Sequence, residues 1–331
     1  MKRILVIATG GTIASAQGKA GLSPALTGEE LLGYVPEAAD LCELGFVQPM
    51  NIDSTNMTPD GWLAMRDIIR DAYEAWDGFV ILHGTDTLAY TAAALSYLIQ
   101  GSPKPIVVTG SQQPMSSPFT DARLNVYQSL LWAVDDASSE VSVVFGGEVI
   151  RGPRARTQRT MSHTAFVSVN VPPLAYIRGE RIMRGAPAPA ELPAGPVFYD
   201  GLDRRVLVIK LTPALDPRKL MELATSTDAV VLETFGIGGI PERDDYTRVL
   251  EEWVASGRFA VITTQVPEEG VDLGIYEVGK RWQDHPGILL GADMTTEAVL
   301  AKTMWALGQT RDADEVAELF RRPVNGDRIE L

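Results

Sequence analysis

Two short polar segments of this chain hold residue types that can carry out acyl transfer. Thr9–Thr12 and His83–Thr87 each follow a run of apolar residues. A threonine hydroxyl acts as a nucleophile only when a neighbouring group eases the removal of its proton. Two threonines and an aspartate that converge would therefore suggest acyl transfer, with an amine or a carboxylate assisting. The candidate catalytic residues are Thr12, Thr85 and Asp86.

Two further segments are rich in short polar side chains. Asn51–Asn56 stands before a predicted helix, and Thr109–Ser111 follows another apolar run. Four such segments at the ends of strands are enough to bind a small polar molecule through both of its charges. Structural interpretations stay open at each of them, because paired glycines form tight turns and Thr, Ser, Asp and Asn cap helices and build turns.

The chain lacks the patterns of several other kinds of site. The dinucleotide fingerprint G-x-G-x-x-G does not follow the first apolar run. The three histidines have no G-x-S-x-G partner, which argues against a serine-protease-like triad. No set of His, Asp and Glu has the spacing of metal ligands, and the single Cys42 cannot form an internal disulfide or a thiolate metal site. We therefore expect no metal and no cofactor.

The elements that must position these residues are short strands and the helices between them. Runs of β-branched residues alternate with helical patterns, which indicates parallel strands joined by crossover helices, and hence an α/β fold. Ligands bind at the carboxyl ends of such strands, where the polar segments lie. Apolar side chains spaced by three and four from Trp62 to Trp76 predict a helix with one buried face that starts at Thr58–Asp60. The predicted strands are residues 4–8, 79–83, 106–109, 141–145, 206–211, 229–234 and 259–263.

The length of 331 residues favours two domains, because it exceeds what one hydrophobic core usually organises. The stretch GAPAPAELPAGP, residues 185–196, is rich in proline, which removes backbone donors and fixes φ. Neither a helix nor a sheet can run through it. We predict an N-terminal domain over residues 1–185, a linker over 186–204 and a smaller C-terminal α/β domain over 205–331.

The charge of the chain limits its partners. It carries 29 Lys and Arg against 43 Asp and Glu, a formal net charge of −14. This charge repels phosphate backbones and anionic bilayers, so neither nucleic acid nor a membrane is an expected partner. The one basic cluster, residues 151–159, is expected to be a solvated loop, with anion binding as the alternative. Since no signal peptide or membrane span is visible, we expect a cytoplasmic protein.

The motifs together resemble a known family. The segments ATGGTIAS, DSTNM, ILHGTDTLAYTAAALSYL, VTGSQ and GADMTTEAVLAKT are similar to those of bacterial-type L-asparaginases, within them the cytoplasmic type I branch. The resemblance covers nearly the whole chain. It implies a larger N-terminal domain with a flavodoxin-like, mostly parallel sheet and a smaller C-terminal α/β domain. It also implies a homodimer or homotetramer with active sites where one subunit meets the next.

The resemblance implies a role for each candidate residue. Thr12 would attack the side-chain amide of L-asparagine, release ammonia and leave an acyl-enzyme that water cleaves to L-aspartate. Thr85 would help to activate the nucleophile or the water and to hold the oxyanion, and Asp86 would bind the α-amino group. The other substrate-binding positions would be Asp53, Ser54 and Thr55 near the α-carboxylate, and Ser111, whose carbonyl would lie near the amide nitrogen.

The sequence departs from the family pattern at the proton-handling lysine. Alignment of residues 151–170 by their ends puts Thr157 at the position of that lysine. Arginine cannot accept a proton from a hydroxyl, although it supplies positive charge. If Arg156 or Arg159 replaces the lysine, turnover should be weak.

A second departure lies in the loop that resembles an active-site lid, between Ser15 and Thr27. Most members have a tyrosine there, and Leu22 stands nearest to that position. Glycines keep such a loop able to close over a substrate. Lys19 is the lysine of this loop that could approach the site. The segment GIGGIP, residues 236–241, also lacks the asparagines that some relatives carry.

Three functional hypotheses follow. The leading one is an L-asparaginase, with glutamine as a possible second substrate because one methylene is discriminated by only ~1 to 3 kcal/mol. The alternative, motivated by Thr157, is an inactive or weakly active amino-acid-binding protein on the same scaffold. An amidotransferase subunit that supplies ammonia to misacylated tRNA is disfavoured, because the chain starts at its first strand and its charge of −14 opposes tRNA.

Overall fold

The computed structural model divides the chain into two compact units, Met1–Tyr199 and Asp200–Leu331. It describes residues 1–18, 21–24, 30, 33–185, 192–223, 226–241, 245–274, 285 and 287–329. The predicted linker, residues 186–204, spans this division, and its residues 186–191 lie outside the described residues.

An eight-stranded sheet organises the first unit, with strand order β13-β12-β9-β8-β7-β5-β1-β4. The five strands from β4 to β8 in this order run parallel to one another, whereas β9, β12 and β13 extend the sheet as antiparallel strands. Numbered along the chain, the parallel strands have the spatial order 2-1-3-4-5, which is the flavodoxin-like arrangement. The strands are β1 (Arg3–Ala8), β4 (Glu43–Val47), β5 (Gly78–Leu82), β7 (Ile106–Thr109), β8 (Val141–Phe145), β9 (Glu148–Arg151), β12 (Ala175–Arg178) and β13 (Arg181–Arg184).

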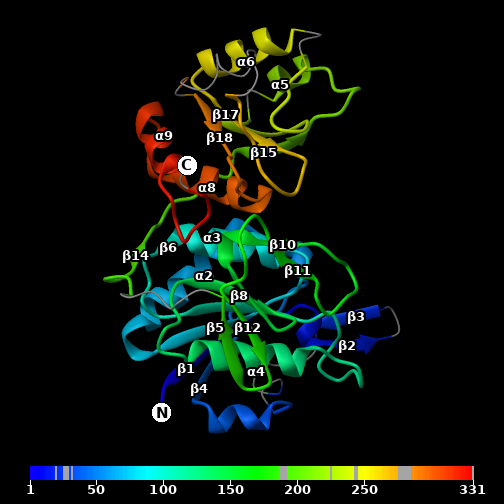
Figure 1. Cartoon of the computed structure of the whole chain (residues 1–331), viewed down its shortest axis with the longest axis vertical. Helices are drawn as coiled ribbons and strands as arrows, with labels where there is room; N and C mark the ends of the chain where they lie inside the picture. Colours follow the sequence, from blue (N-terminus) through cyan, green and yellow to red (C-terminus); the bar gives the residue numbers. More distant parts are fainter. Residues whose placement is uncertain are drawn as a thin grey trace. The chain divides into compact units, whose positions relative to one another are not determined.

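Helices cover both faces of this sheet. Figure 1 shows α2 (Pro59–Ala72) and α3 (Leu88–Leu98) on one side of it and α4 (Ala122–Ala133) on the other. Because both faces are covered, β5, β7 and β8 are buried at every residue. The continuous apolar runs of the sequence are explained by this double burial.

Shorter elements complete the first unit. Two-stranded sheets pair β2 with β3, β10 with β11, and β6 with β14. These strands are β2 (Ser15–Gly18), β3 (Gly21–Pro24), β6 (Ile99–Gln100), β10 (Ala155–Thr157), β11 (Phe166–Ser168) and β14 (Val197–Phe198). The 3-10 helices are η1 (Thr12–Ala14), η2 (Pro36–Asp40), η3 (Ser54–Asn56), η4 (Tyr73–Ala75) and η5 (Gly152–Arg154).

The second unit has a parallel four-stranded sheet in the order β15-β16-β17-β18. Helix α8 packs against three of these strands and against α9. The strands are β15 (Val206–Lys210), β16 (Ala229–Thr234), β17 (Phe259–Thr264) and β18 (Ile288–Leu290), and the helices are α5 (Arg218–Glu222), α6 (Tyr246–Ala255), α8 (Thr296–Gln309) and α9 (Ala313–Arg321). The predicted α/β class, with a larger, mostly parallel N-terminal sheet and a smaller C-terminal α/β unit, is confirmed.

Two predictions about individual residues need correction. The basic cluster is not a solvated loop throughout, because Arg154 is completely buried in η5. Thr58 stands at the N-cap position of α2 as predicted, but its side chain makes no capping hydrogen bond. The predicted buried face of α2 is confirmed, since Trp62, Met65 and Ile69 are buried, but the helix ends at Ala72 and Trp76 lies beyond it.

Candidate active site

The candidate site lies where the order of the parallel strands reverses. β1 is flanked by β4 on one side and by β5 on the other, although β4 and β5 both follow it in the chain. Open α/β sheets bind ligands in the crevice at such a switch point, outside the carboxyl ends of the strands. Thr9–Thr12 leaves β1 there, and His83–Thr87 leaves β5 there. A hydrogen bond from Thr9 N to Leu82 O, 3.0 Å long, holds the two ends together.

Glycines let these two segments touch through their backbones. A β-carbon on Gly11 would lie 2.3 Å from Cα of Gly84, and Gly11 has a φ of +81°. A β-carbon on Gly84 would lie 2.5 Å from the Ser54 hydroxyl. No other residue type fits at such distances. Thr12 and Thr85 therefore each follow one glycine of a contacting pair.

The segment 51–56 packs against both of these turns. Gly11 N donates to Ile52 O over 2.9 Å, and Ile52 N donates to Thr9 O over 2.9 Å. The Thr87 hydroxyl donates to Ser54 O over 2.8 Å. Three segments that are distant in the sequence are thus held to one another by hydrogen bonds.

Asp53 begins the turn η3 and acts as its cap. Its Oδ1 accepts hydrogen bonds from both the amide and the hydroxyl of Thr55, each 2.9 Å long. A carboxylate repels another carboxylate, so Asp53 suits the ordering of Ser54 and Thr55 better than direct contact with a substrate carboxylate.

The end of β7 supplies the fourth segment. His83 N donates to Thr109 O over 2.8 Å, and a β-carbon on Gly110 would lie 2.3 Å from His83 O. The Ser111 hydroxyl donates to Gln113 O over 2.6 Å. Ser111 is therefore brought to the same edge of the sheet as His83–Thr87.

The sequence-predicted residues differ in their exposure. Thr12 and Thr85 are half-buried, and Asp86 is exposed. Ser54 and Ser111 are buried. Asp53 and Thr55 are exposed as well, so the two serines are the predicted site residues least open to an arriving molecule.

Beside the site, a completely buried histidine joins two elements. His83 Nδ1 lies 2.7 Å from Gly84 O, and its Nε2 lies 3.0 Å from the Thr91 hydroxyl, which also accepts a 3.0 Å hydrogen bond from Trp62 Nε1. These partners are satisfied together when a neutral imidazole carries its proton on Nδ1. Burial lowers the pKa of His83 to about 4, so the ring is neutral at pH 7.

By the resemblance, Thr157 stands at the position of the family lysine. Thr157 ends β10, is half-buried and pairs with Phe166 of β11. β10 packs against α3, the helix that follows Thr87. Arg159 is exposed and donates to Thr164 O within its own loop over 2.8 Å. Lys19 lies outside the described residues, and of the lid only the backbone hairpin β2–β3, which includes Leu22, is described.

Sequence reasoning missed two residues that hold the Ser111 segment. Asp121 and Asn125 are buried at the start of α4 and bond to the backbone of residues 110–113. A polar pair four residues apart on a helix was the available signal, but such pairs are common on helix surfaces.

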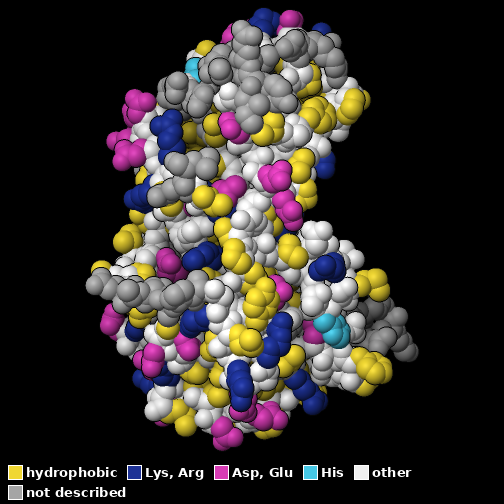
Figure 2. All heavy atoms as spheres, viewed as in Figure 1, with side chains coloured by type: hydrophobic (Ala, Val, Ile, Leu, Met, Phe, Trp, Pro, Cys, Tyr) yellow, Lys and Arg dark blue, Asp and Glu magenta, His cyan; other side chains and the backbone are white. Residues whose placement is uncertain are grey.

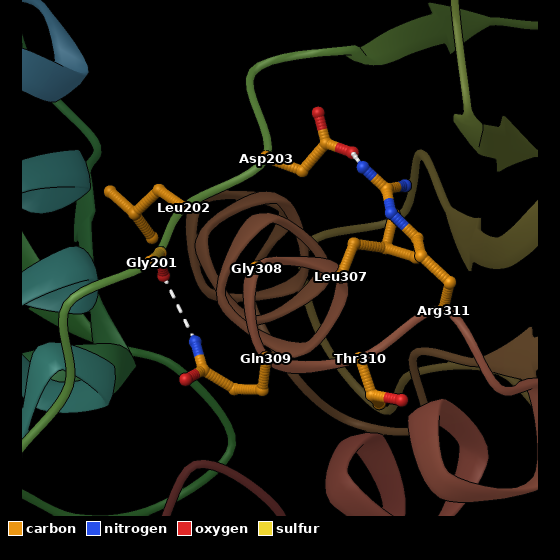
Figure 3. Close-up of a pocket in the computed structure, with 8 residues that line it drawn as sticks. All are labelled: Gly201, Leu202, Asp203, Leu307, Gly308, Gln309, Thr310 and Arg311. Carbon is orange, nitrogen blue, oxygen red and sulfur yellow. Dashed lines mark hydrogen bonds and ion pairs between the residues drawn. The ribbon is translucent and has the colours of Figure 1, made fainter.

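A hollow lies in the second unit. It has a volume of about 360 Å³, and none of the sequence-predicted site residues lines it. Figure 3 shows Arg311 directed at Asp203 and Gln309 directed at Gly201 O. Because the charges of Arg311 and Asp203 compensate each other, this pair offers no free charge to a ligand in the hollow. Its lining consists of Gly201, Leu202, Asp203, Leu307, Gly308, Gln309, Thr310 and Arg311.

Among the described residues, no group of three or more His, Cys, Asp or Glu is placed to hold a metal ion. None of the described helices is long and apolar enough to cross a membrane. Figure 2 shows acidic and basic side chains interspersed over the visible face.

The fold and the site define an α/β protein with a threonine-rich site at a topological switch point, and comparison with known proteins gives its family. The family model for the N-terminal domain of asparaginases matches residues 3–188, and the glutaminase/asparaginase C-terminal domain model matches residues 205–320. The chain therefore belongs to the asparaginase family of amide hydrolases.

Individual relatives cover this chain almost completely. The L-asparaginase of Thermococcus kodakarensis is 38% identical over 98% of each chain, and its structure superposes with a TM-score of 0.91 over 99% of this chain and 100% of that one. L-asparaginase I of Vibrio cholerae is 30% identical, with a TM-score of 0.87 and 99% of each chain covered. A glutamyl-tRNA(Gln) amidotransferase chain of Metallosphaera sedula is 32% identical over 98% of this chain and 76% of its own.

Proposed function

We propose that this chain is an L-asparaginase that hydrolyses the side-chain amide of L-asparagine with Thr12 as its nucleophile. The observation that carries the proposal is the backbone contact between Gly11 and Gly84 at the switch point. This contact brings the segments of Thr12 and Thr85 together beside the exposed Asp86. Hydroxyls and a carboxylate at one edge suit an amino acid whose side chain ends in an amide.

The proposed reaction has two halves. The Thr12 hydroxyl loses its proton as its oxygen attacks the amide carbon. The C–N bond then breaks, the nitrogen takes up the proton and leaves as ammonia, and an aspartyl ester of Thr12 forms. Water attacks the ester, L-aspartate leaves, and the hydroxyl of Thr12 regains its proton. Thr85 assists these proton transfers and the oxyanion.

Substrate binding completes the proposal. Asp86 binds the α-ammonium group, and Ser54 and Thr55, ordered by Asp53, face the α-carboxylate. The Ser111 carbonyl accepts a hydrogen bond from the amide nitrogen. Assembly as a homodimer or homotetramer and a cytoplasmic location stay predictions from the sequence.

One observation favours a second candidate function. Thr157 ends β10 at the position that the resemblance gives to the proton-handling lysine, and a threonine there suits an amino-acid-binding protein with little or no turnover. The amidotransferase hypothesis rests on the similarity to chains such as that of Metallosphaera sedula, of which the match covers 76%.

Ammonia release from L-asparagine and L-glutamine by the purified chain distinguishes the two candidates. We expect turnover of L-asparagine, and we expect Thr85→Ala to reduce it strongly. The control variant Thr160→Ala, at an exposed position of the loop after β10, should leave turnover unchanged. If no ammonia is released while calorimetry detects binding of L-aspartate, the enzyme hypothesis fails and the binding-protein hypothesis takes its place.

A further inference from the structure

The segment that contains Ser111 is held by two buried polar side chains of α4. Asp121 accepts hydrogen bonds from Gln112 N at 3.0 and 3.1 Å and from Gln113 N at 3.0 Å. Asn125 Nδ2 donates to Gly110 O over 2.9 Å and to Asp121 Oδ2 over 3.1 Å. The side-chain oxygen of Asn125 accepts from Gly146 N over 3.0 Å. Asp121 and Asn125 are only 6% and 1% exposed.

Asp121 does not play the usual role of its position. It is the N-cap residue of α4, where an aspartate normally accepts from the first amides of its own helix. Its side chain makes no capping bond to α4 and turns back to residues 112 and 113 instead. The hydroxyl of Thr120 accepts from Ala122 N in its place, over 3.0 Å. The carboxylate is thus committed to the backbone beside Ser111.

These bonds fix the two peptide groups on either side of Ser111. The amide of Gln112 and the carbonyl of Ser111 belong to one planar trans peptide, so they point in opposite directions. Asp121 holds the amide, and the Ser111 carbonyl therefore points away from Asp121. In the preceding peptide, Asn125 holds the carbonyl of Gly110. Neither peptide can rotate without breaking hydrogen bonds to buried groups.

The Ser111 carbonyl is left to accept from something else. None of the described residues donates a hydrogen bond to it. Buried carbonyls are nearly always paired, so an aimed carbonyl of this kind suits a ligand N–H. Ser111 is completely buried, and a substrate must displace a neighbouring group to reach it. The amide nitrogen of asparagine carries two such hydrogens.

We propose that Asp121 and Asn125 are positioning residues that aim the Ser111 carbonyl at the leaving nitrogen of the substrate. The inference rests on the proposed asparaginase function. It explains why the site would prefer an amide, whose leaving group is a nitrogen, over an ester. The Ser111 carbonyl accepts a hydrogen bond from the amide nitrogen of the bound substrate and then from the departing ammonia. An ester substrate whose leaving group is an alcohol has no N–H at that place and gains nothing from the aimed carbonyl.

The test compares two substrates that give the same acyl-enzyme. L-asparagine and the β-methyl ester of L-aspartate are offered to the full-length protein, and L-aspartate is measured in both reactions. For Asp121→Asn and for Asn125→Ala we expect kcat/KM for the amide to fall about 100-fold, which is the loss typical of a reacting group displaced by about 1 Å. The kcat/KM for the ester should stay close to that of the unmutated chain. Thr120→Val is the matched control, because its hydroxyl bonds to Gln113 O and Ala122 N but not to either peptide of Ser111.

The outcomes separate the inference from the function on which it rests. Equal losses with both substrates, or no loss with either, would overturn the positioning role. If the unmutated chain hydrolyses neither substrate, the proposed function fails, and the inference falls with it. Asp121→Asn is isosteric, and circular dichroism of each variant checks its fold. Asn125→Ala gives an independent result if Asp121→Asn does not fold.

Discussion

At the scale of single residues, we expect Thr157 to limit proton transfer in the proposed reaction. A lysine can act as a base when its pKa is lowered, whereas an arginine, or a threonine hydroxyl without a basic neighbour, cannot act as a base near neutral pH. We expect Thr157→Lys to raise kcat for L-asparagine about 100-fold, the lower range of general acid–base catalysis. Steady-state ammonia release measures the change.

The control for this prediction places the same charge nearby. Thr160→Lys adds a lysine at an exposed position of the loop that follows β10. It should leave kcat unchanged, because its ammonium points into solvent. If both lysine variants gain equally, the gain is a general effect of charge and Thr157 does not mark the position of the family lysine.

His83 makes the stability of the first unit sensitive to acid. Its pKa is lowered from 6.5 to about 4 by burial, so the unfolded chain takes up a proton at a higher pH than the folded chain. Its contribution to the free energy of unfolding is therefore complete above about pH 6.5 and is lost as the pH falls to about 4, by about 3 kcal/mol. Urea unfolding at several pH values measures this loss.

The matched variant for this measurement is His83→Asn. It removes the titrating ring and keeps a side-chain amide that can donate to Gly84 O. We expect its free energy of unfolding to fall less steeply than that of the unmutated chain between pH 6.5 and pH 4. Parallel pH profiles for the two proteins would show that His83 does not titrate in this range.

Residue types indicated the candidate residues of the site but not the residues that support them. Thr12, Thr85 and Asp86 stand out in the sequence because they follow glycines and apolar runs. The positions of Asp121 and Asn125 depend on how α4 packs against the end of β7, which no local pattern reveals. The burial of Arg154 in η5 was missed for the same reason, because it results from tertiary packing and not from a local pattern.

At the scale of elements, the contact between the turns after β1 and β5 depends on glycine. For Gly11→Ala we expect a loss of at least about 2 kcal/mol in stability, because the new carbon would overlap Gly84 and alanine disfavours a φ of +81°. Thermal unfolding measures it, and ammonia release should fall as Thr12 moves.

Gly179→Ala separates the steric effect from the conformational one. Gly179 also has a positive φ, of +60°, but nothing lies within 4 Å of its added carbon. It should cost only about 1 kcal/mol. If the two variants lose the same stability, the close contact between Gly11 and Gly84 contributes nothing.

Most of the strands that the sequence predicted are buried along their length, and β15 is the exception, since its Leu207 and Val208 are exposed. Runs such as 106–109 and 229–234 match β7 and β16 in their bounds, because burial on both faces makes most of their residues apolar. The edge strand β4 was not predicted, since its residues Glu43–Val47 are exposed or half-buried. The antiparallel strands β9, β12 and β13 were missed because they are short and rich in arginine and other polar residues.

At the scale of the whole molecule, a buried ion pair fastens the C-terminal segment of the second unit. Lys302 Nζ lies 2.6 Å from Asp327 Oδ2, and both side chains are fully buried. Lys302 also donates to Arg322 O over 2.7 Å. Removing one charge of such a pair costs about 3–5 kcal/mol. We expect Asp327→Asn to speed hydrogen exchange over residues 200–331 and not over residues 1–199.

Glu318→Gln provides the comparison, because Glu318 is an exposed acid of the neighbouring helix α9. It should leave exchange in the second unit unchanged. Exchange that rises equally in both units after Asp327→Asn would contradict a local role for the pair.

The central claim is that the Thr12 hydroxyl is the nucleophile, and one set of rates tests it most directly. Ammonia release from L-asparagine is measured for the unmutated chain, for Thr12→Ser, which keeps a hydroxyl, and for Thr12→Ala, which removes it. The account predicts measurable turnover by Thr12→Ser and a loss of at least about 1,000-fold in kcat for Thr12→Ala. Turnover by Thr12→Ala at the rate of the unmutated chain would contradict it.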